Sequence, residues 1–218
     1  MRTAELFDLT KTAAQPLLSC YDHAEKSLTQ LHRCIEKLGG VLDTELYTEI
    51  SPGVWAAKNA VICESAQILA PCIIGEGAVI RQCAYIRGSV LVGRECVIGN
   101  STEVKNSILF DRVQIPHFNY VGDSVLGYAV HLGAGAVTSN VKSDKSEVYI
   151  THDGVRESSG RRKLGAVIGD MSEIGCGAVL CPGTVIGKNT TVYPLTLVRG
   201  TVPSGSILKN DGTIVGKY

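Results

Sequence analysis

Two basic residues and one histidine have the types and spacing needed to bind an anion and move a proton. Arg87 and Lys105 lie 18 positions apart, and each directly follows an aliphatic residue. The planar fork of an Arg and the point charge of a Lys both suit the oxygens of a phosphate. His117 directly follows Pro116. An imidazole fixed beside a phosphate-sized anion could act as a general base near neutral pH.

The elements that must position these side chains come from a repeat of six residues. Steps of six give nine apolar residues in succession at Ile62, Ile68, Ile74, Ile80, Ile86, Val92, Ile98, Val104 and Phe110. A second run, in a shifted phase, contains Ile168, Ile174, Leu180, Ile186, Val192 and Val198. A period of six is neither helical nor a single alternating strand, so each hexad is a short strand with a corner that must stack on its neighbours. We therefore predict an all-β fold, a parallel β-helix with three hexads in each coil.

Coil geometry places Arg87 and Lys105 one above the other, because three hexads separate them and neighbouring strands lie about 4.8 Å apart. Two cations this close repel each other unless an anion lies between or beside them. The spacing therefore favours a phosphate site. Two alternatives remain open: the side chains diverge into the solvent, or they pair with Glu103 and Asp111.

The surroundings of His117 favour a catalytic role. A step of 18 residues back from His117 reaches Gly99, which would leave room beside the imidazole for a substrate. The repeat slips by one residue around 116–120, since the apolar steps continue at Val121 and Leu126. The alternative is an ordinary surface histidine.

Residues 1–50 depart from the repeat and show a helical pattern. Asp22 and Glu25 have the spacing of a capping box at the start of a helix. One face of this helix would carry Leu28, Leu31, Ile35 and Leu38. We predict that residues 1–50 form a helical N-terminal cap over the open end of the coil, and that the β-helix spans residues 51–218.

Residues 143–163 form a second departure, because this segment is too polar for a coil. The apolar residues 148–150 and Val155 flank Asp153 and Gly154, a pair typical of a hairpin with a primed turn. We predict a β-hairpin that projects from the β-helix as an arm.

Composition and charge limit the possible partners. The 21 Lys and Arg residues balance the 21 Asp and Glu residues, so a surface for nucleic acid is not expected. No apolar stretch reaches the length of a membrane span, and the N-terminus lacks the pattern of a signal peptide. The eight cysteines contain no C-x-x-C pair. These features predict a cytoplasmic protein with reduced cysteines and no membrane partner.

Four segments carry a resemblance to a known family. They are residues 99–105, residues 116–123 with the pattern H-x-x-Y-x-G-D, residues 132–136 and residues 159–165. The first three resemble the C-terminal acetyltransferase half of the bacterial bifunctional enzyme that acetylates glucosamine-1-phosphate and then uridylylates the product. The fourth is similar to archaeal sugar-phosphate nucleotidylyltransferase/acetyltransferases. The resemblance covers roughly residues 50–205.

This resemblance implies a left-handed β-helix and a role for each matching residue. His117 matches the catalytic base and Glu103 the carboxylate that supports it. The substrate-binding positions correspond to Arg87, Lys105, Tyr120, His131, Asn140 and Lys163, although His131 stands where the bacterial enzyme usually has an Asn. Ala134 matches a backbone contact to acetyl-CoA, and Cys176 replaces a Ser near the coenzyme. Members of the family form homotrimers with active sites between neighbouring subunits.

The implied function is an N-acetyltransferase that uses acetyl-CoA as co-substrate and an amino-sugar phosphate, such as glucosamine-1-phosphate, as acceptor. The resemblance implies direct acyl transfer, with no metal and no covalent enzyme intermediate. No nucleotidyltransferase domain is expected within these 218 residues.

Two alternatives compete with this function. Zinc-dependent carbonic anhydrases share the β-helix but use three histidines, two of them five residues apart, and His117, His131 and His152 do not have that spacing. The second alternative is a non-catalytic module that binds a sugar phosphate or sugar nucleotide, or that assembles with a separate nucleotidyltransferase.

Overall fold

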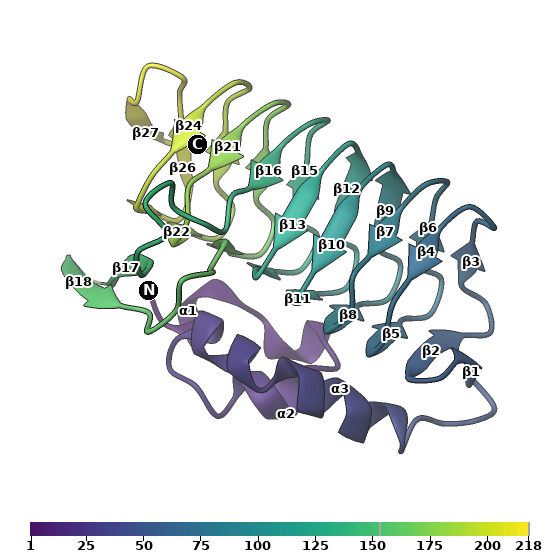
Figure 1. The fold of residues 1–218 in the computed structure, drawn as a ribbon. Helices are drawn as coiled ribbons and strands as arrows, with labels where there is room; N and C mark the ends of the chain where they lie inside the picture. The colour runs from purple at the N-terminus through teal and green to yellow at the C-terminus, as the bar shows by residue number, and fades with distance from the viewer. Residues whose placement is uncertain (153, 218) are drawn as a thin grey trace.

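The computed structural model describes residues 1–152 and 154–217. Most of this chain winds into a parallel β-helix, and the N-terminal helices lie along one side of it (Figure 1). The coils contribute short strands to three sheets, here called sheets A, B and C. The predicted parallel β-helix is confirmed.

Within each sheet the strands follow one another along the axis of the β-helix. Sheet A contains β1 (Tyr47–Ser51), β2 (Val54–Ala57), β5 (Cys72–Ile74), β8 (Val90–Val92), β11 (Ser107–Leu109), β14 (Val125–Leu126), β19 (Ala166–Ile168), β22 (Thr184–Ile186) and β25 (Thr201–Val202). Sheet B contains β3 (Val61–Ile62), β6 (Val79–Ile80), β9 (Val97–Asn100), β12 (Gln114–His117), β15 (His131–Leu132), β20 (Glu173–Ile174), β23 (Thr191–Val192), β26 (Ser206–Leu208) and β27 (Ile214–Gly216). Sheet C contains β4 (Gln67–Ile68), β7 (Tyr85–Ile86), β10 (Glu103–Lys105), β13 (Tyr120–Gly122), β16 (Val137–Thr138), β21 (Val179–Leu180) and β24 (Leu197–Val198).

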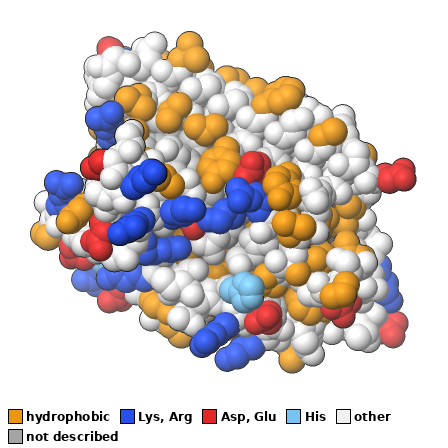
Figure 2. Space-filling view, in the orientation of Figure 1, with side chains coloured by type: hydrophobic (Ala, Val, Ile, Leu, Met, Phe, Trp, Pro, Cys, Tyr) orange, Lys and Arg blue, Asp and Glu red, His pale blue; other side chains and the backbone are white. Residues whose placement is uncertain are grey.

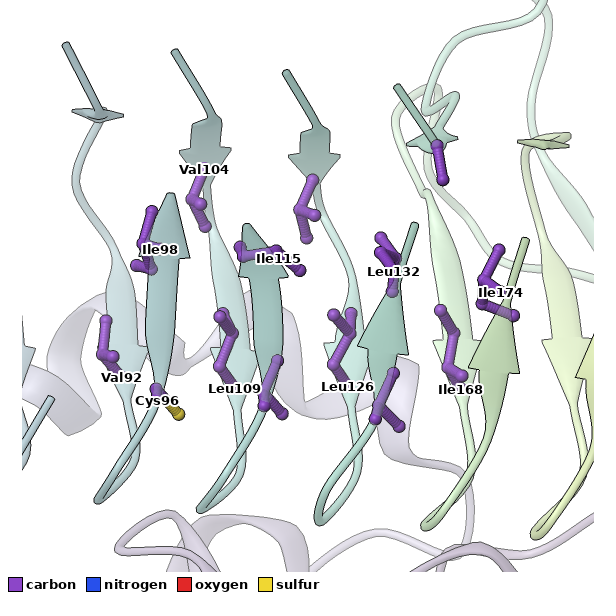
Figure 3. Packing of buried hydrophobic residues seen from close by; sticks show 14 of the residues in the cluster. Val92, Cys96, Ile98, Val104, Leu109, Ile115, Leu126, Leu132, Ile168 and Ile174 are labelled. Atoms are coloured by element: carbon purple, nitrogen blue, oxygen red, sulfur yellow. The ribbon is translucent and has the colours of Figure 1, made fainter. Parts of the chain in front are cut away.

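Aliphatic side chains fill the interior of the coil (Figure 3). They stack coil upon coil, since Ile80 pairs with Ile98 and Ile98 pairs with Ile115. The predicted inward residues from Ile74 to Val104, and those of the second run, are all buried in this one core. Full burial of each such side chain stabilises the fold by about 1.5–3 kcal/mol.

The repeat loses a residue earlier than the sequence predicts. Val92 pairs with Leu109, so Leu109 and not Phe110 belongs to the core of the coil. Phe110 packs in a second cluster outside sheet A, where its ring centroid lies 4.9 Å from that of Phe7. The prediction that Phe110 is the ninth inward residue is therefore wrong.

The shortened corner lies between sheets C and A. Only four residues separate the inward side chains of Val104 and Leu109, and the same short step recurs one coil later. Asn106 (φ +44°) and Asp123 (φ +49°) turn the chain at these two corners. Asn and Asp adopt this left-handed backbone more readily than other residues with a Cβ, so they suit a tight corner.

The N-terminal helices cover sheet A. They are α1 (Thr3–Leu6), the 3₁₀ helix η1 (Leu9–Lys11), α2 (Gln15–Leu18), the 3₁₀ helix η2 (Ala24–Thr29) and α3 (Leu31–Gly39). Their apolar residues form one buried cluster with the outward face of sheet A, which carries Ile73, Leu91, Ile108, Val125, Val167 and Val185. The predicted cap over the open end of the coil is therefore wrong, because a whole apolar sheet face must be removed from water.

The helix expected after Asp22 is divided in two. The 3₁₀ helix η2 begins at Ala24 with His23 at its N-cap, so Asp22 lies one residue before the N-cap position that the predicted capping box requires. Leu31 and Ile35 are fully buried, as the pattern predicts. Within residues 1–152 and 154–217, no helix is long and apolar enough to cross a lipid bilayer.

The predicted hairpin arm is present. Its strands β17 (Tyr149–His152) and β18 (Val155–Ser158) pair in antiparallel register. Asp153, the first residue of the predicted turn, lies outside the described residues, and Gly154 has φ +82°. Val148 and Ile150 are buried in the same cluster as the N-terminal helices, so the base of the arm is anchored to the rest of the fold.

Candidate functional site

Sheet C presents the predicted polar side chains on its outer face. Val104 points into the coil, so its neighbours Glu103 and Lys105 point outward. Glu103 pairs with Tyr85 on one side and Tyr120 on the other. Because Ile86 also pairs with Val104, Arg87 lies beside Lys105 as the spacing predicts. The three strands β7, β10 and β13 therefore gather these residues on one surface.

Each of the two stacked cations has a carboxylate partner. The Arg87 guanidinium donates to Glu103 Oε1 at 2.7 Å, and this hydrogen bond raises the pKa of Arg87. Lys105 Nζ lies 3.1 Å from Asp123 Oδ2. Asp111, the other partner considered from the sequence, instead holds Arg94 at 3.0 Å on a different corner. Of the two carboxylates considered from the sequence as partners of the stacked cations, Glu103 is therefore such a partner and Asp111 is not.

Asp123 is the centre of a buried network that the sequence did not reveal. Its side chain is 2% exposed. It accepts hydrogen bonds from Asn106 Nδ2 at 2.7 Å and Asn140 Nδ2 at 2.6 Å, and Arg161 from the arm segment lies 3.4 Å from Oδ1. The only available signal was its place at the end of the H-x-x-Y-x-G-D pattern.

Tyr120 lies between this network and Glu103. Its side chain hydrogen-bonds to Asn140, and burial together with the charges of Asp123 and Glu103 raises the pKa of its phenol. Tyr120 therefore stays protonated at neutral pH and can donate a hydrogen bond to a ligand.

Lys163 continues the cationic surface beyond sheet C. It forms an antiparallel bridge with Val141, next to Asn140, and its side chain is exposed. Arg162 beside it is also exposed. Lys and Arg side chains form a band across this face of the molecule towards the β17–β18 hairpin (Figure 2).

His117 lies at the corner where sheet B leads into sheet C. The corner is fixed from inside by the buried Asn119, whose Oδ1 accepts a hydrogen bond from His117 N at 3.1 Å. Asn119 Nδ2 donates to the carbonyls of Gly133 and Ala136 at 2.8 and 3.0 Å. His117 itself is exposed, so its imidazole is carried on a rigid corner and faces solvent.

The residue below His117 is Asn100 and not Gly99. His117 and Asn100 are partners in the parallel pairing of β12 with β9, because the short corner has reduced the coil to 17 residues. Gly99 lies below Pro116, where an added Cβ would overlap the Pro116 carbonyl. The predicted space for substrate beneath His117 is therefore wrong, and Gly99 serves close packing between coils.

Ala134 and Cys176 occupy the same corner as His117 in successive coils. The amide of Gly135 donates to the His117 carbonyl at 3.0 Å, and the amide of Gly177 donates to the Ala134 carbonyl at 2.9 Å. Both Ala134 and Cys176 are exposed. The structure thus gathers the predicted base and the predicted coenzyme-side residues along one edge of sheet C.

Two predicted associations are not formed within one chain. Glu103 N donates to the Asn119 carbonyl at 2.9 Å, so Glu103 begins its strand beside the His117 corner, yet its carboxylate holds Arg87. No hydrogen bond to the His117 imidazole forms in the described part of the chain. His131 lies on sheet B, where its Nδ1 is 2.8 Å from Glu173 Oε2, and so it does not join the residues on sheet C.

A search for metal ligands among the residues that the structure describes finds no group of three or more His, Cys, Asp and Glu side chains that could hold an ion.

Two family models match the β-helix. A model described as the GMPPB C-terminal domain matches residues 68–153, and one described as bacterial transferase hexapeptide (six repeats) matches residues 165–200. The resemblance indicated by the sequence motifs is also confirmed by curated relatives.

One such relative is a bifunctional sugar-1-phosphate nucleotidylyltransferase/acetyltransferase from Sulfurisphaera tokodaii. It is 43% identical over 96 residues, which cover 44% of this chain and 24% of the relative. The bifunctional protein GlmU from Methanococcus maripaludis is 33% identical over 110 residues, which cover 50% of this chain and 26% of GlmU. The chain therefore spans about a quarter of the length of these relatives.

Solved structures of similar shape include a mutant of AntD, an N-acyltransferase from Bacillus cereus, in complex with dTDP and coenzyme A. The TM-score is 0.43 at 13% identity, covering 79% of this chain and 91% of that chain.

Proposed function

We propose that this protein is an N-acetyltransferase that transfers the acetyl group of acetyl-CoA to the amine of an amino-sugar phosphate such as glucosamine-1-phosphate. The observation that carries this proposal is the arrangement of sheet C. Stacked cations lie on its outer face, and an exposed histidine lies on the rigid corner that leads into it from sheet B. The sequence similarity to nucleotidylyltransferase/acetyltransferases agrees with such a site.

The phosphate of the acceptor would bind at Arg87 and Lys105. Both cations lie at the surface, with side chains 42% and 25% exposed. A phosphate dianion carries more charge than either carboxylate partner and can accept hydrogen bonds from both cations at once. Lys163 would add long-range attraction, because it is exposed and bridges to Val141, next to Asn140.

His117 would act as the general base. As the amine of the sugar attacks the thioester carbonyl carbon, a C–N bond forms, the nitrogen loses a proton to the imidazole, and the C–S bond breaks. The thiolate of coenzyme A leaves and takes up a proton. Small residues suit a coenzyme at the adjoining corner, since Ala134 is exposed and a Cβ added at Gly135 would meet nothing within 4 Å.

Glu103 would support His117 only after the acceptor has bound. A phosphate at Arg87 competes with Glu103 for the guanidinium, which now holds the carboxylate at 2.7 Å. The released carboxylate lies on the strand beside the His117 corner, where it could hydrogen-bond the imidazole and stabilise its charged form.

Release of free thiol from acetyl-CoA tests this function. Purified protein is mixed with glucosamine-1-phosphate, galactosamine-1-phosphate, glucosamine-6-phosphate, a uridine-diphosphate amino sugar and unphosphorylated glucosamine. We expect turnover with at least one phosphorylated acceptor and much slower turnover with glucosamine. Absence of turnover with every acceptor would reject the acetyltransferase.

A non-catalytic module that binds a sugar phosphate or nucleotide is the second candidate. It is favoured by one observation: the Glu103 carboxylate is held by Arg87 and does not orient His117. Such a module would bind glucosamine-1-phosphate in calorimetry without releasing thiol, and it would co-purify with a separate nucleotidyltransferase. The same thiol assay therefore separates the two candidates.

A further inference from the structure

Asp123 contacts three segments that are far apart in sequence. Its carboxylate contacts Lys105 and Asn106 on the coil below, Asn140 on the coil above, and Arg161 at the end of the arm. The distances are 3.1, 2.7, 2.6 and 3.4 Å. A carboxylate has about four lone-pair positions, so these four donors use its full capacity.

The backbone of Asp123 takes part in the same connection. Its amide donates to the Lys105 carbonyl at 2.9 Å, and its carbonyl accepts from Gly165 N at 2.9 Å. Gly165 lies two residues after the end of the arm segment 143–163, so both the side chain and the main chain of Asp123 hold the point where the arm returns to the coil. The left-handed conformation of Asp123 turns its carboxylate towards these partners at the shortened corner.

The charges of this network are unequal. One carboxylate, only 2% exposed, faces two cations whose side chains are 25% and 20% exposed, Lys105 and Arg161. Arg161 Nη1 is buried and has no hydrogen-bond partner in the part of the chain that the structure describes. The network therefore has one surplus positive charge and, on Arg161, one unused donor.

We infer that Asp123 is a positioning residue for the substrate site, a role that rests on the function proposed above. It holds Lys105 and Asn140 against the outer face of sheet C and docks the arm through Arg161. The arm and the phosphate site are thereby coupled, because the same carboxylate orients a cation in each. Loss of its charge weakens the binding of the acceptor and loosens the arm together.

The test uses Asp123→Asn in the 218-residue chain. The amide keeps the size of the side chain but removes its charge and turns one acceptor into a donor that faces Lys105, Asn140 or Arg161. Asp111→Asn is the matched control, since Asp111 is 8% exposed and holds Arg94 at 3.0 Å on a corner away from sheet C. Arg161→Met removes the arm contact alone, and Arg33→Met, at an exposed position of α3 on the helical side, controls for the loss of a positive charge.

Kinetics and hydrogen exchange give independent readouts. For Asp123→Asn we expect KM for glucosamine-1-phosphate to rise by about 10- to 100-fold, as for a lost hydrogen bond to a charged group, while KM for acetyl-CoA changes little. The arm amides of Val148 and Ser159, which donate to Arg161 O and Val148 O, should exchange faster in Asp123→Asn and Arg161→Met. Both control variants should retain the wild-type KM and arm protection.

Three results would overturn the inference. The first is a wild-type KM together with wild-type arm exchange in Asp123→Asn. The second is that Asp111→Asn raises the KM and the rate of arm exchange as much as Asp123→Asn does, which would indicate general loss of stability. The third is loosening of the arm without any change in acceptor binding. If the wild-type protein has no turnover, the proposed function fails separately, and the same comparison is made with calorimetric binding of glucosamine-1-phosphate and inorganic phosphate.

Discussion

The guanidinium of Arg87 holds the carboxylate of Glu103 at 2.7 Å, although one was expected to bind substrate and the other to support a catalytic base. The two side chains come from neighbouring strands of sheet C, where Tyr85 and Glu103 are direct partners. This pairing satisfies both charges. Under the proposed function, an anion at Arg87 would change the partner available to Glu103, so acceptor binding and base catalysis would be linked.

Replacement of His117 by Ala is expected to abolish most turnover and little else. A positioned general base contributes on the order of 10²–10⁴ in rate, so kcat should fall by about that factor. The side chain is exposed and the corner is fixed by Asn119, so the melting temperature and sugar-phosphate binding should remain near those of the wild type. Steady-state kinetics measure kcat, and calorimetry measures the melting temperature and the binding of the sugar phosphate.

Asn119→Ala is the contrasting variant for His117, because it removes three hydrogen bonds made by a buried side chain. It should lose stability as well as activity. An active His117→Ala protein would exclude the general-base role.

Replacement of Arg87 or Lys105 by Met should weaken binding of the phosphate. Each variant loses a charge-assisted hydrogen bond to the acceptor, so KM for the phosphorylated acceptor should rise by roughly 10- to 100-fold. Sulfate should compete with the acceptor in the wild type and less strongly in the variants. Arg94→Met removes a cation of the Arg94–Asp111 pair and serves as control. Unchanged KM in both Arg87→Met and Lys105→Met would place the phosphate elsewhere.

The chain is expected to form a homotrimer through the corner between sheets B and C. Phe118 and Leu195 at this corner are 63% and 80% exposed and have positive φ values of 53° and 58°. Exposed apolar side chains of this size on one edge indicate a buried interface. Light scattering should give a mass about three times the 23.2 kDa of the chain.

Leu195→Asp should reduce that mass to the monomer, whereas Val41→Asp, at a 79% exposed position on the helical side, should not. A wild-type monomer in dilute solution would contradict an active site shared between subunits.

Gly99→Ala should destabilise the coil, because its Cβ would overlap the Pro116 carbonyl and the backbone cannot give way easily. Overpacking of this kind costs about 1–3 kcal/mol. Gly200 is a suitable comparison, because it has φ +73° and a Cβ there meets nothing within 4 Å. Gly200→Ala should therefore cost only backbone strain, about 1–2 kcal/mol. Urea unfolding at neutral pH measures the free energy of unfolding of both variants. If Gly99→Ala is as stable as the wild type, Gly99 is not required for packing.

Asp170 should give a measurable pH dependence of stability. Its carboxylate accepts the backbone amides of Asp8 and Tyr128 at 2.7 and 2.8 Å, and burial raises its pKa above the usual 3.8. The folded state then binds this proton more tightly than the unfolded chain, so the stabilisation is present at acid pH and is lost as pH rises through the raised pKa.

We therefore expect the free energy of unfolding of the wild type, minus that of Asp170→Asn, to decrease as pH rises from about 4 towards neutrality. Urea titrations at several pH values measure this difference. A difference that increases with pH would contradict the raised pKa.

The sequence alone determined the β-helix, because a period of six residues repeated over many coils leaves few other ways to bury one aliphatic residue in each hexad. It also placed Arg87 beside Lys105, since their relation depends only on coil length upstream of the first short corner. The hairpin was also predictable, because its turn depends on residues that are adjacent in sequence. Each of these features depends on residues that are near in sequence or related by the repeat.

The tertiary structure decided what depends on exact register and on distant partners. The corner at Asn106 is one residue shorter than the repeat predicts. As a result, Leu109 lies in the core, Phe110 packs against the helices, and Asn100 instead of Gly99 lies below His117. No local pattern marks such a loss.

The network of Asp123 likewise joins residues up to 38 positions apart through side-chain contacts that a linear repeat does not encode. The helices cover sheet A instead of the coil end, because the apolar outward residues of that sheet become one continuous face only when the coils stack.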